Sequence, residues 1–442
     1  MNHPASNAIG RLLSAGHDVL ADCVGCAWSL AFLAGLMLWI VPATLAQDQP
    51  PGAVQVPSPE WSRQLGGEMT FNSSSMMMDI NDQNELVVMG ITLDPSGVQT
   101  PALVRYCLDG EGQLLASEHL GELSFYPDTL TEIVIDSAGN IYIASSVPRD
   151  PGMGGHSLIV LKLDSQGNEL WLEQLHSKGN DNFRAMALDS QGNIYITGDT
   201  NGVLGESNAG SYDAHLIKYD SAGNHVWTRQ FGTEAFDQGC NLAIDDQDNI
   251  YVVGDTYGNM AQPVVGETDT FLVKFDSQGQ TLWTTQHSMG EKDMGTRLVL
   301  DPQGGIYVGG ILDYGNHRAV FISRLDEHGG HVWSHSVGDD RTSVWLKKIE
   351  VDRQGGVYIF GNTRGDLGGS NAGRDDMFLW KYDGDGQVLW TEMSGTHEHD
   401  FARDLLIDDQ GDIYLAGSTR GRFIDTPEDD EGHLVILKYE AE

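Results

Sequence analysis

The sequence predicts an all-β fold, a seven-bladed β-propeller of four-stranded antiparallel blades. The first observation is a repeat: the stretch Leu188-Asp-Ser-Gln-Gly-Asn-Ile-Tyr-Ile-Thr-Gly198 returns along the chain with variations, at centres 51 to 56 residues apart. A fixed period of this length is typical of propellers and solenoids. The second observation is the alternation of apolar and polar residues between Asp/Gly turns, which is typical of β-hairpins. The seven centres are Leu86-Val87, Ile141-Tyr142, Ile194-Tyr195, Ile250-Tyr251, Ile306-Tyr307, Val357-Tyr358 and Ile413-Tyr414.

One repeat unit, residues 184–232, shows how a blade is expected to form. Its first two strands are joined by the turn Asp189-Ser-Gln-Gly-Asn193, in which the Asp side chain can accept backbone hydrogen bonds and Gly192 supplies a positive φ. Asp220-Ser-Ala-Gly-Asn224 repeats this chemistry between the third and fourth strands. Four strands in two hairpins, repeated radially, make a propeller. The expected strands are 185–188, 193–198, 214–219 and 225–231.

The two ends of the chain fix the number of blades. The seventh unit stops after His433-Leu-Val-Ile-Leu-Lys-Tyr439 and lacks the fourth strand, which carries a Trp in other units. That strand occurs instead at Glu60-Trp61-Ser-Arg-Gln-Leu-Gly66. We therefore expect the N-terminal strand to complete the last blade and close one propeller domain over 60–442. The Trp residues, which we interpret as packing groups, are Trp61, Trp171, Trp227, Trp283, Trp333 and Trp390.

Residues 1–46 differ from the rest of the chain. The uncharged apolar run from Cys23 to Ala46 ends in small residues and predicts a signal peptide. The alternative is an uncleaved membrane anchor, because 24 uncharged residues can span a bilayer. A polar Gln/Pro-rich linker follows at 47–59. Either alternative predicts an exported propeller, secreted or held at the cell surface or in the periplasm.

The formal charge of −39 narrows the choice of partners. Nucleic-acid binding needs clustered Lys and Arg to neutralise phosphates, so no nucleic acid is expected. Membrane contact is expected only if the N-terminal apolar segment is retained. After that segment the chain keeps only Cys107 and Cys240, which fall in different units, so the fold should not depend on a disulfide. We expect a monomer.

Two signatures are paired in these units, Lys-apolar-Asp-x-x-Gly-x-x-x-Trp and Asp-x-x-Gly-Asn-Ile-Tyr-apolar-x-Gly. Units three and six agree best, in Gly198-Asp-Thr-Asn-Gly-Val-Leu-Gly-Glu-Ser-Asn-Ala-Gly210 and Gly361-Asn-Thr-Arg-Gly-Asp-Leu-Gly-Gly-Ser-Asn-Ala-Gly373. Over about residues 60–440 the chain resembles the SBBP beta-propeller repeat family of exported bacterial proteins. The resemblance implies the fold, but it brings no shared reaction or catalytic residue. Unit one departs from the pattern, with Asn81 and Asn84 in place of the turn Asp and Gly.

An acidic residue stands eight positions before the first turn Asp in five of the seven units. We expect these side chains at the mouth of the axial channel, on the face that carries the long loops. Clustered oxygen ligands suit hard cations, which predicts a ligand or cation site, with Ca²⁺ as the candidate cofactor. The alternative is that each Asp caps its own interblade turn. The five residues are Asp128, Asp181, Asp237, Asp293 and Asp400.

His397 and His399 form an H-x-H pair in His397-Glu-His-Asp400, at the same expected mouth. Such a pair could ligate a transition metal, and the alternative is a solvated loop. The sequence has no G-x-S-x-G, H-E-x-x-H or P-loop motif, so no catalytic residue is predicted. We expect a non-catalytic scaffold that binds a protein or glycan through its loop-bearing face. The alternative is a propeller hydrolase or lyase with a cation-dependent site at the channel mouth.

Overall fold

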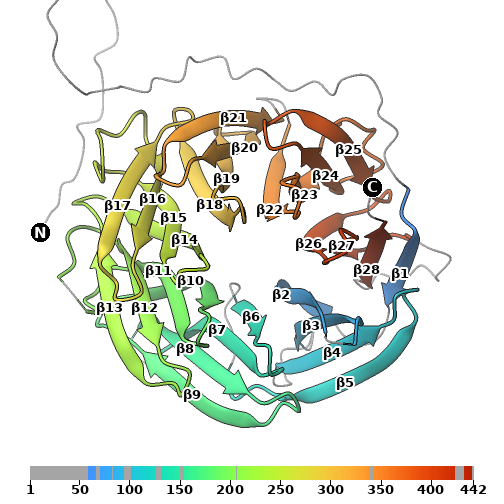
Figure 1. The fold of residues 1–442 in the computed structure, drawn as a ribbon, viewed down its shortest axis with the longest axis horizontal. Helices are drawn as coiled ribbons and strands as arrows, with labels where there is room; N and C mark the ends of the chain where they lie inside the picture. The colour runs from blue at the N-terminus through green and yellow to red at the C-terminus, as the bar shows by residue number, and fades with distance from the viewer. Residues whose placement is uncertain are drawn as a thin grey trace, which may run out of the picture. The chain divides into compact units, whose positions relative to one another are not determined.

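The computed structural model describes residues 58–65, 70–81, 83–93, 101–125, 131–149, 154–205, 207–338, 342–423 and 433–440. These residues form seven four-stranded antiparallel sheets, arranged as blades around a common centre (Figure 1). The predicted seven-bladed propeller is therefore confirmed. No helix in these ranges is long and apolar enough to cross a membrane. The predicted signal or anchor, 1–46, and the linker up to residue 57 lie outside the described residues.

Each blade runs from an innermost to an outermost strand, and blades one to seven start at successive innermost strands. The innermost strands are β2 (Thr70–Ile80), β6 (Thr131–Ile135), β10 (Asp181–Leu188), β14 (Asp237–Ile244), β18 (Asp293–Leu300), β22 (Val344–Val351) and β26 (Asp400–Ile407). The second strands are β3 (Leu86–Leu93), β7 (Ile141–Pro148), β11 (Ile194–Thr200), β15 (Ile250–Thr256), β19 (Ile306–Asp313), β23 (Val357–Thr363) and β27 (Ile413–Thr419). The third strands are β4 (Ala102–Leu108), β8 (His156–Leu163), β12 (Asp213–Tyr219), β16 (Asp269–Phe275), β20 (Arg318–Leu325), β24 (Asp376–Tyr382) and β28 (His433–Tyr439). The outermost strands are β5 (Leu114–Glu122), β9 (Glu169–Leu175), β13 (His225–Phe231), β17 (Thr281–His287), β21 (His331–Val337), β25 (Val388–Ser394) and β1 (Trp61–Leu65).

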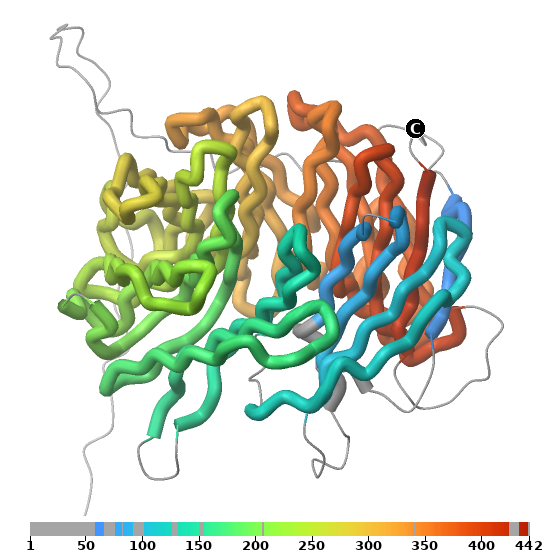
Figure 2. The backbone as a smooth tube through the Cα atoms, turned by 60° about the horizontal axis from the view of Figure 1, so that its bottom comes forward, coloured from blue at the N-terminus to red at the C-terminus, as the bar shows by residue number. Residues whose placement is uncertain are grey.

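The ring closes as the sequence predicts. The N-terminal strand β1 pairs with β28 in the sheet β1-β28-β27-β26, with Trp61 opposite Lys438. In Figures 1 and 2 the blue N-terminal strand lies beside the red strands from the end of the chain. The innermost strands also touch in sequence order from β2 to β26, and β26 touches β2. Blade seven is thus built from both ends of the propeller.

The turn chemistry is also as predicted. Asp189 Oδ1 accepts hydrogen bonds from the backbone N–H groups of Gln191 at 3.0 Å and Asn193 at 2.9 Å. Gly192 has a φ of +75°, which the turn requires. These contacts explain why Asp, Gly and Asn return at fixed spacing in the sequence.

A ladder of three side chains crosses most blades. In blade three Lys218 pairs with Tyr195 on one side and Trp227 on the other. The Lys218 Nζ atom lies 4.7 Å from the centre of the Tyr195 ring, and the two aromatic rings meet edge to face at 5.9 Å. Cross-strand pairs of this kind stabilise a sheet, so the repeated Trp is a packing group. The same ladder occurs in Tyr142/Lys162/Trp171, Tyr251/Lys274/Trp283, Tyr358/Lys381/Trp390 and Tyr414/Lys438/Trp61.

Four of these Trp rings, those of Trp61, Trp171, Trp227 and Trp283, also pack against a turn glycine of the next blade. A Cβ atom on Gly223 of blade three would lie 2.8 Å from the Trp171 ring of blade two. Gly112 of blade one stands in the same relation to Trp61 of blade seven, again at 2.8 Å. Both glycines have positive φ, +89° and +74°. The last-to-first junction therefore uses the same contact as an interior junction.

Candidate functional site

The predicted acidic positions occupy equivalent places in four blades. Asp181, Asp237, Asp293 and Asp400 are the first residues of β10, β14, β18 and β26, and each side chain is fully buried. Asp128 lies outside the described residues. The four residues are therefore set back from solvent at one end of the innermost strands.

Their carboxylates bind the connection that enters the blade from its neighbour. Asp181 Oδ2 accepts a hydrogen bond from the Ser177 N–H at 2.6 Å, and Asp181 Oδ1 accepts one from the Thr200 hydroxyl at 2.6 Å. Asp293 Oδ2 accepts the Met289 N–H at 2.8 Å. The corresponding acceptors for Thr233 N–H and Thr396 N–H are Asp237 and Asp400. These hydrogen bonds are those of the turn-capping alternative.

Burial also changes the acidity of these groups. Burial raises the pKa of Asp293 to about 7, and the neighbouring carboxyl of Asp269 adds to the rise. Burial raises the pKa of Asp237 and of Asp400 in the same direction. Among the described residues no group of three or more His, Cys, Asp or Glu side chains could hold a metal ion. Ca²⁺ binding at the acidic positions thus remains a prediction without a described ligand cluster.

The two predicted histidines are in different environments. The His397 side chain is 67% exposed. The Nδ1 atom of His399 instead forms a short contact with Asp375 Oδ2, and its Nε2 atom lies 3.3 Å from Arg374 Nη1. Both ring nitrogens of His399 therefore lie beside charged groups, and metal binding by His397 and His399 stays a prediction.

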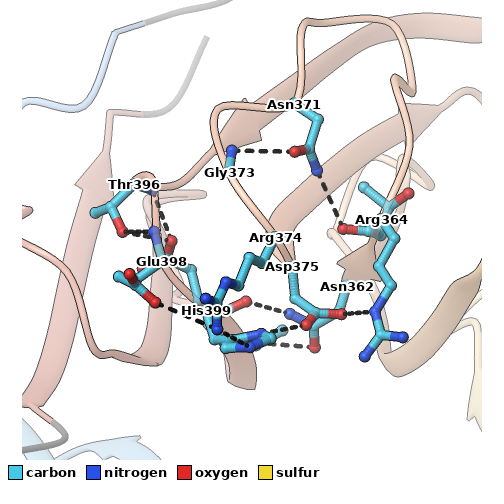
Figure 3. A network of polar contacts seen from close by, with 12 residues as sticks. Asn362, Arg364, Asn371, Gly373, Arg374, Asp375, Thr396, Glu398 and His399 are labelled. Atoms are coloured by element: carbon cyan, nitrogen blue, oxygen red, sulfur yellow. Dashed lines mark hydrogen bonds and ion pairs between the residues drawn. The ribbon is translucent and has the colours of Figure 1, made fainter.

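His399 belongs to a polar network between blades six and seven (Figure 3). Its centre is Asp375, whose carboxylate is 2% exposed and also accepts a hydrogen bond from Arg364 Nε at 2.9 Å. The Arg364 and Arg374 side chains are 59% and 61% exposed. Arg374 Nη1 additionally lies 3.6 Å from Glu398 Oε2. A buried carboxylate and a glutamate therefore orient two solvent-exposed guanidinium groups; below, these five residues are called the Asp375 network.

Aromatic rings pack below the Asp375 network. The guanidinium of Arg364 lies 5.3 Å above the Trp345 ring. The His399 ring stacks on Phe401 with 5.6 Å between centres and 6° between planes. Trp345 and Phe401 are the second residues of β22 and β26. The network is thus held from the side by hydrogen bonds and from below by rigid rings.

A second feature is an axial cavity of about 570 Å³ between the innermost strands. All seven blades contribute to its wall. In blades three to seven the innermost strand has a register shift, a β-bulge, and the extra residue lines the cavity. A bulge redirects the side chain of the unpaired residue, which explains why residue type can vary here without disturbing the sheet. The five extra residues are Arg184, Cys240, Thr296, Lys347 and Arg403.

The acidic side chains of this cavity connect neighbouring blades. Glu132 of β6 accepts the Met186 N–H of β10 at 2.5 Å. Asp404 of β26 accepts the Met78 N–H of β2 at 2.8 Å, across the junction that closes the ring. Lys348 Nζ lies 3.2 Å from Asp404 Oδ1, and this carboxylate holds the pKa of Lys348 above its ordinary value. Sequence reasoning missed both the cavity and the Asp375 network.

Comparisons with known proteins agree with the resemblance seen in the sequence. Residues 172–205 and 226–259 match the family model of the SBBP beta-propeller repeat. The regulatory protein FlaEY of Caulobacter vibrioides is 24% identical over 255 residues, which cover 53% of this chain and 22% of FlaEY. A WD repeat-containing protein of Acanthamoeba polyphaga mimivirus is 25% identical over 113 residues, covering 23% of this chain and 8% of that protein. The chain therefore spans less than a quarter of the length of these curated relatives.

Solved structures of low sequence identity are similar to this chain. BBS1N in complex with ARL6DN is 12% identical with a TM-score of 0.49, covering 87% of this chain and 98% of that one. The structure described as YCF48 bound to D1 peptide is 12% identical with a TM-score of 0.45, covering 88% and 98%. Puromycin hydrolase is 12% identical with a TM-score of 0.48, covering 85% and 54%.

Proposed function

We propose that this seven-bladed propeller with SBBP repeats is an exported, non-catalytic binding protein that recognises a protein or glycan through its loop-bearing face. The observation that carries the proposal is the Asp375 network. It presents two exposed arginine side chains: Arg364 is held by the buried Asp375 carboxylate, and Arg374 is held by Glu398 and His399. Arginine that is already oriented loses little conformational freedom on binding, and arginine is enriched among the residues that dominate interfaces.

The residues around the Asp375 network favour ligand binding over catalysis. His399, the group best suited to move a proton, is placed between Asp375 and Arg374, and the hydrogen bonds of the network join it to no Ser, Thr or Cys side chain. Trp345 provides rigid apolar surface below Arg364, and Phe401 provides it below His399. Arginine beside aromatic rings suits a partner that offers carboxylates or sugar rings. The similarity to part of a regulatory protein is consistent with a binding role.

The test is a binding screen of the full chain against a panel of acidic and neutral glycans and of acidic and basic peptides. The best ligand is then titrated against Arg374→Ala. Loss of a central arginine should weaken binding by roughly tenfold or more. The matched control is Arg353→Ala, because Arg353 is 66% exposed and also paired, with Asp409, but lies in a turn of the repeat. Equal affinities of the two variants, or no ligand in the panel, would contradict the proposal.

The competing function is a hydrolase or lyase that uses a cation at the acidic positions. Turnover of an ester or glycoside panel, lost with Asp181→Ala plus Asp237→Ala, would support it. Melting temperatures of these variants must be measured alongside, because both carboxylates accept backbone hydrogen bonds. We expect no turnover; a rise of the melting temperature with Ca²⁺ that is lost in these variants would support a cation site at the acidic positions.

A further inference from the structure

The charge of the axial cavity differs from the charge of the whole chain. The chain has a formal charge of −39, yet the described wall of the cavity has more cationic than acidic side chains. The acidic side chains are Asp79, Glu132, Glu350 and Asp404. The cationic side chains are Arg184, Arg297, Lys347, Lys348 and Arg403. Five cations stand against four acids, so the excess of positive charge is one. The ion pairs between these groups concentrate the unneutralised positive charge in one part of the wall.

Two of the cations have carboxylate partners. Lys348 lies within 3.4 Å of both Glu350 and Asp404, and Arg184 Nε lies 3.2 Å from Asp199 Oδ1. Three neighbouring cations, Arg297, Lys347 and Arg403, are left over. Within the described ranges none of the three has a carboxylate oxygen within 4.0 Å, and the Lys347 amine has no hydrogen-bond acceptor.

The two arginines of this trio donate only to neutral oxygens. Arg297 donates from Nε to the Lys347 carbonyl and from Nη1 to the Thr296 carbonyl at 2.7 Å. Arg403 donates from Nε and Nη2 to the Ser418 hydroxyl, at 3.1 and 2.7 Å. These bonds fix the planes of the guanidinium groups but do not neutralise them. One terminal nitrogen of each, Nη2 of Arg297 and Nη1 of Arg403, has no acceptor among the described residues.

The three cations are half-buried in the wall of the cavity, and Arg297 and Arg403 repel Lys347. Burial, followed by repulsion from Arg297 and Arg403, lowers the pKa of Lys347 to about 7. Burial likewise lowers the pKa of Arg403 to about 10. An anionic partner stabilises cations that are partly withdrawn from water, and a carboxylate or phosphate is the partner that guanidinium and ammonium groups bind best.

We propose that the axial cavity binds a small organic anion whose carboxylate or phosphate group lies between Lys347, Arg297 and Arg403. The three side chains come from the neighbouring strands β18, β22 and β26, so a single anionic group can bridge blades five, six and seven. The volume of about 570 Å³ falls in the range of small-molecule sites, roughly 300–1,000 Å³. Apolar side chains in the same wall, Met76, Ile133 and Ile349, provide contacts for a carbon skeleton.

The cavity and the Asp375 network share no charged side chain, although the Phe401 ring under His399 also lies 5.4 Å from the Arg403 guanidinium. The Asp375 network residues do not line the cavity, and the bulge residues do not belong to the network. Failure of one proposal therefore leaves the other standing. Glu132 and Asp404, which also line the cavity, are engaged with backbone N–H groups of the next blade.

The test is thermal unfolding of the full chain with inorganic phosphate, succinate or glucuronate, each balanced with NaCl to constant ionic strength. Glucose serves as the neutral probe. An anion that binds only the folded state should raise the melting temperature progressively with its concentration. A response to phosphate alone identifies a phosphate-bearing ligand, and a response to succinate or glucuronate identifies a carboxylate-bearing one.

The deciding variant is Lys347→Met, which keeps the length of the side chain and removes its charge. Without anion it should melt at or above the temperature of the parent protein, and its apparent affinity for the anion should fall at least tenfold. Arg403→Gln should weaken the response in the same way, and it serves if Lys347→Met does not fold. Arg353→Gln, a surface control, should respond like the parent protein. The proposal is overturned if no anion exceeds the NaCl effect or if the cavity variants respond fully.

Discussion

The outer part of each blade and the axial cavity use the same repeated frame in opposite ways. In the outer part, Tyr, Lys and Trp return at the same register positions and make the same contacts in most blades. In the cavity, the bulge position holds Arg184, Cys240, Thr296, Lys347 or Arg403, a different environment in almost every blade. The contacts that repeat in most blades stabilise the fold. The positions at which the residue type varies are available for binding a ligand.

The largest effect should come from breaking the outer part at the ring closure. Trp61→Ala removes a buried ring from Tyr414 and from the turn of Gly112, and should cost about 3–5 kcal/mol of unfolding free energy. Urea unfolding measures this value. Trp171→Ala, at an interior junction, is the matched variant and should cost a similar amount. A near-zero cost for Trp61→Ala alone would mean that β1 is dispensable for closing the ring.

In the cavity, a substitution should raise the free energy of unfolding instead of lowering it. Lys347→Met should stabilise the anion-free protein by about 1–4 kcal/mol at pH 6, because it removes a half-buried charge that has no carboxylate partner among the described residues. The pKa of Lys347 is lowered from 10.5 to about 7 by burial, Arg297, Arg403 and Lys348, against the attraction of Asp404. The cost of the protonated amine is therefore full below pH 7 and fades between pH 7 and 10.5. Parent stability should rise over that range, and the rise should be absent in the variant.

The buried Asp side chains that accept hydrogen bonds from the connections between blades should have an intermediate effect on stability. Asp293→Ala leaves the N–H groups of Met289 and Thr270 without their acceptor and should cost about 1–3 kcal/mol. Because burial raises the folded pKa of Asp293 from 3.8 to about 7, its stabilising contribution is full below pH 4 and is lost as the pH rises to 7. Asp293→Asn should remove this slope from a series of unfolding curves. An unchanged slope would show that another group titrates.

The smallest effect should come from one rung of a ladder. Lys218→Met in blade three removes the cation above the Tyr195 ring and the 3.6 Å ion pair with Asp189, but keeps the aliphatic stem. The expected loss is about 0.5–1 kcal/mol by chemical denaturation. A loss above that of Asp293→Ala would mean that the ladder contributes more than the interblade caps.

The sequence was sufficient for the fold because the fold depends on short-range patterns. The turn at Asp189 and Gly192 is completed within five residues, and the Trp61 strand that pairs with β28 carries the Trp of the repeated fourth strand. The acidic positions were recognised, and the turn-capping alternative accounts for their hydrogen bonds. Ligand binding at these positions stays a prediction.

The Asp375 network and the cavity trio were not predicted, because both depend on contacts between distant residues. His399 meets Asp375 across 24 positions of sequence, and Arg297 meets Lys347 across 50. A bulge has no local sequence signature that places Lys347 or Arg403 in the cavity. One signal was nevertheless present: the well-matched units three and six differ at Asn201 against Arg364 and at Tyr212 against Asp375.

The most direct test of the claim that varying positions carry chemistry is anomalous diffraction from a crystal soaked in selenate. Selenate is a tetrahedral anion with a strong anomalous signal. The claim predicts an anomalous peak in the axial cavity, within hydrogen-bond reach of Lys347, Arg297 and Arg403. Peaks only on the outer surface, with none in the cavity, would contradict it.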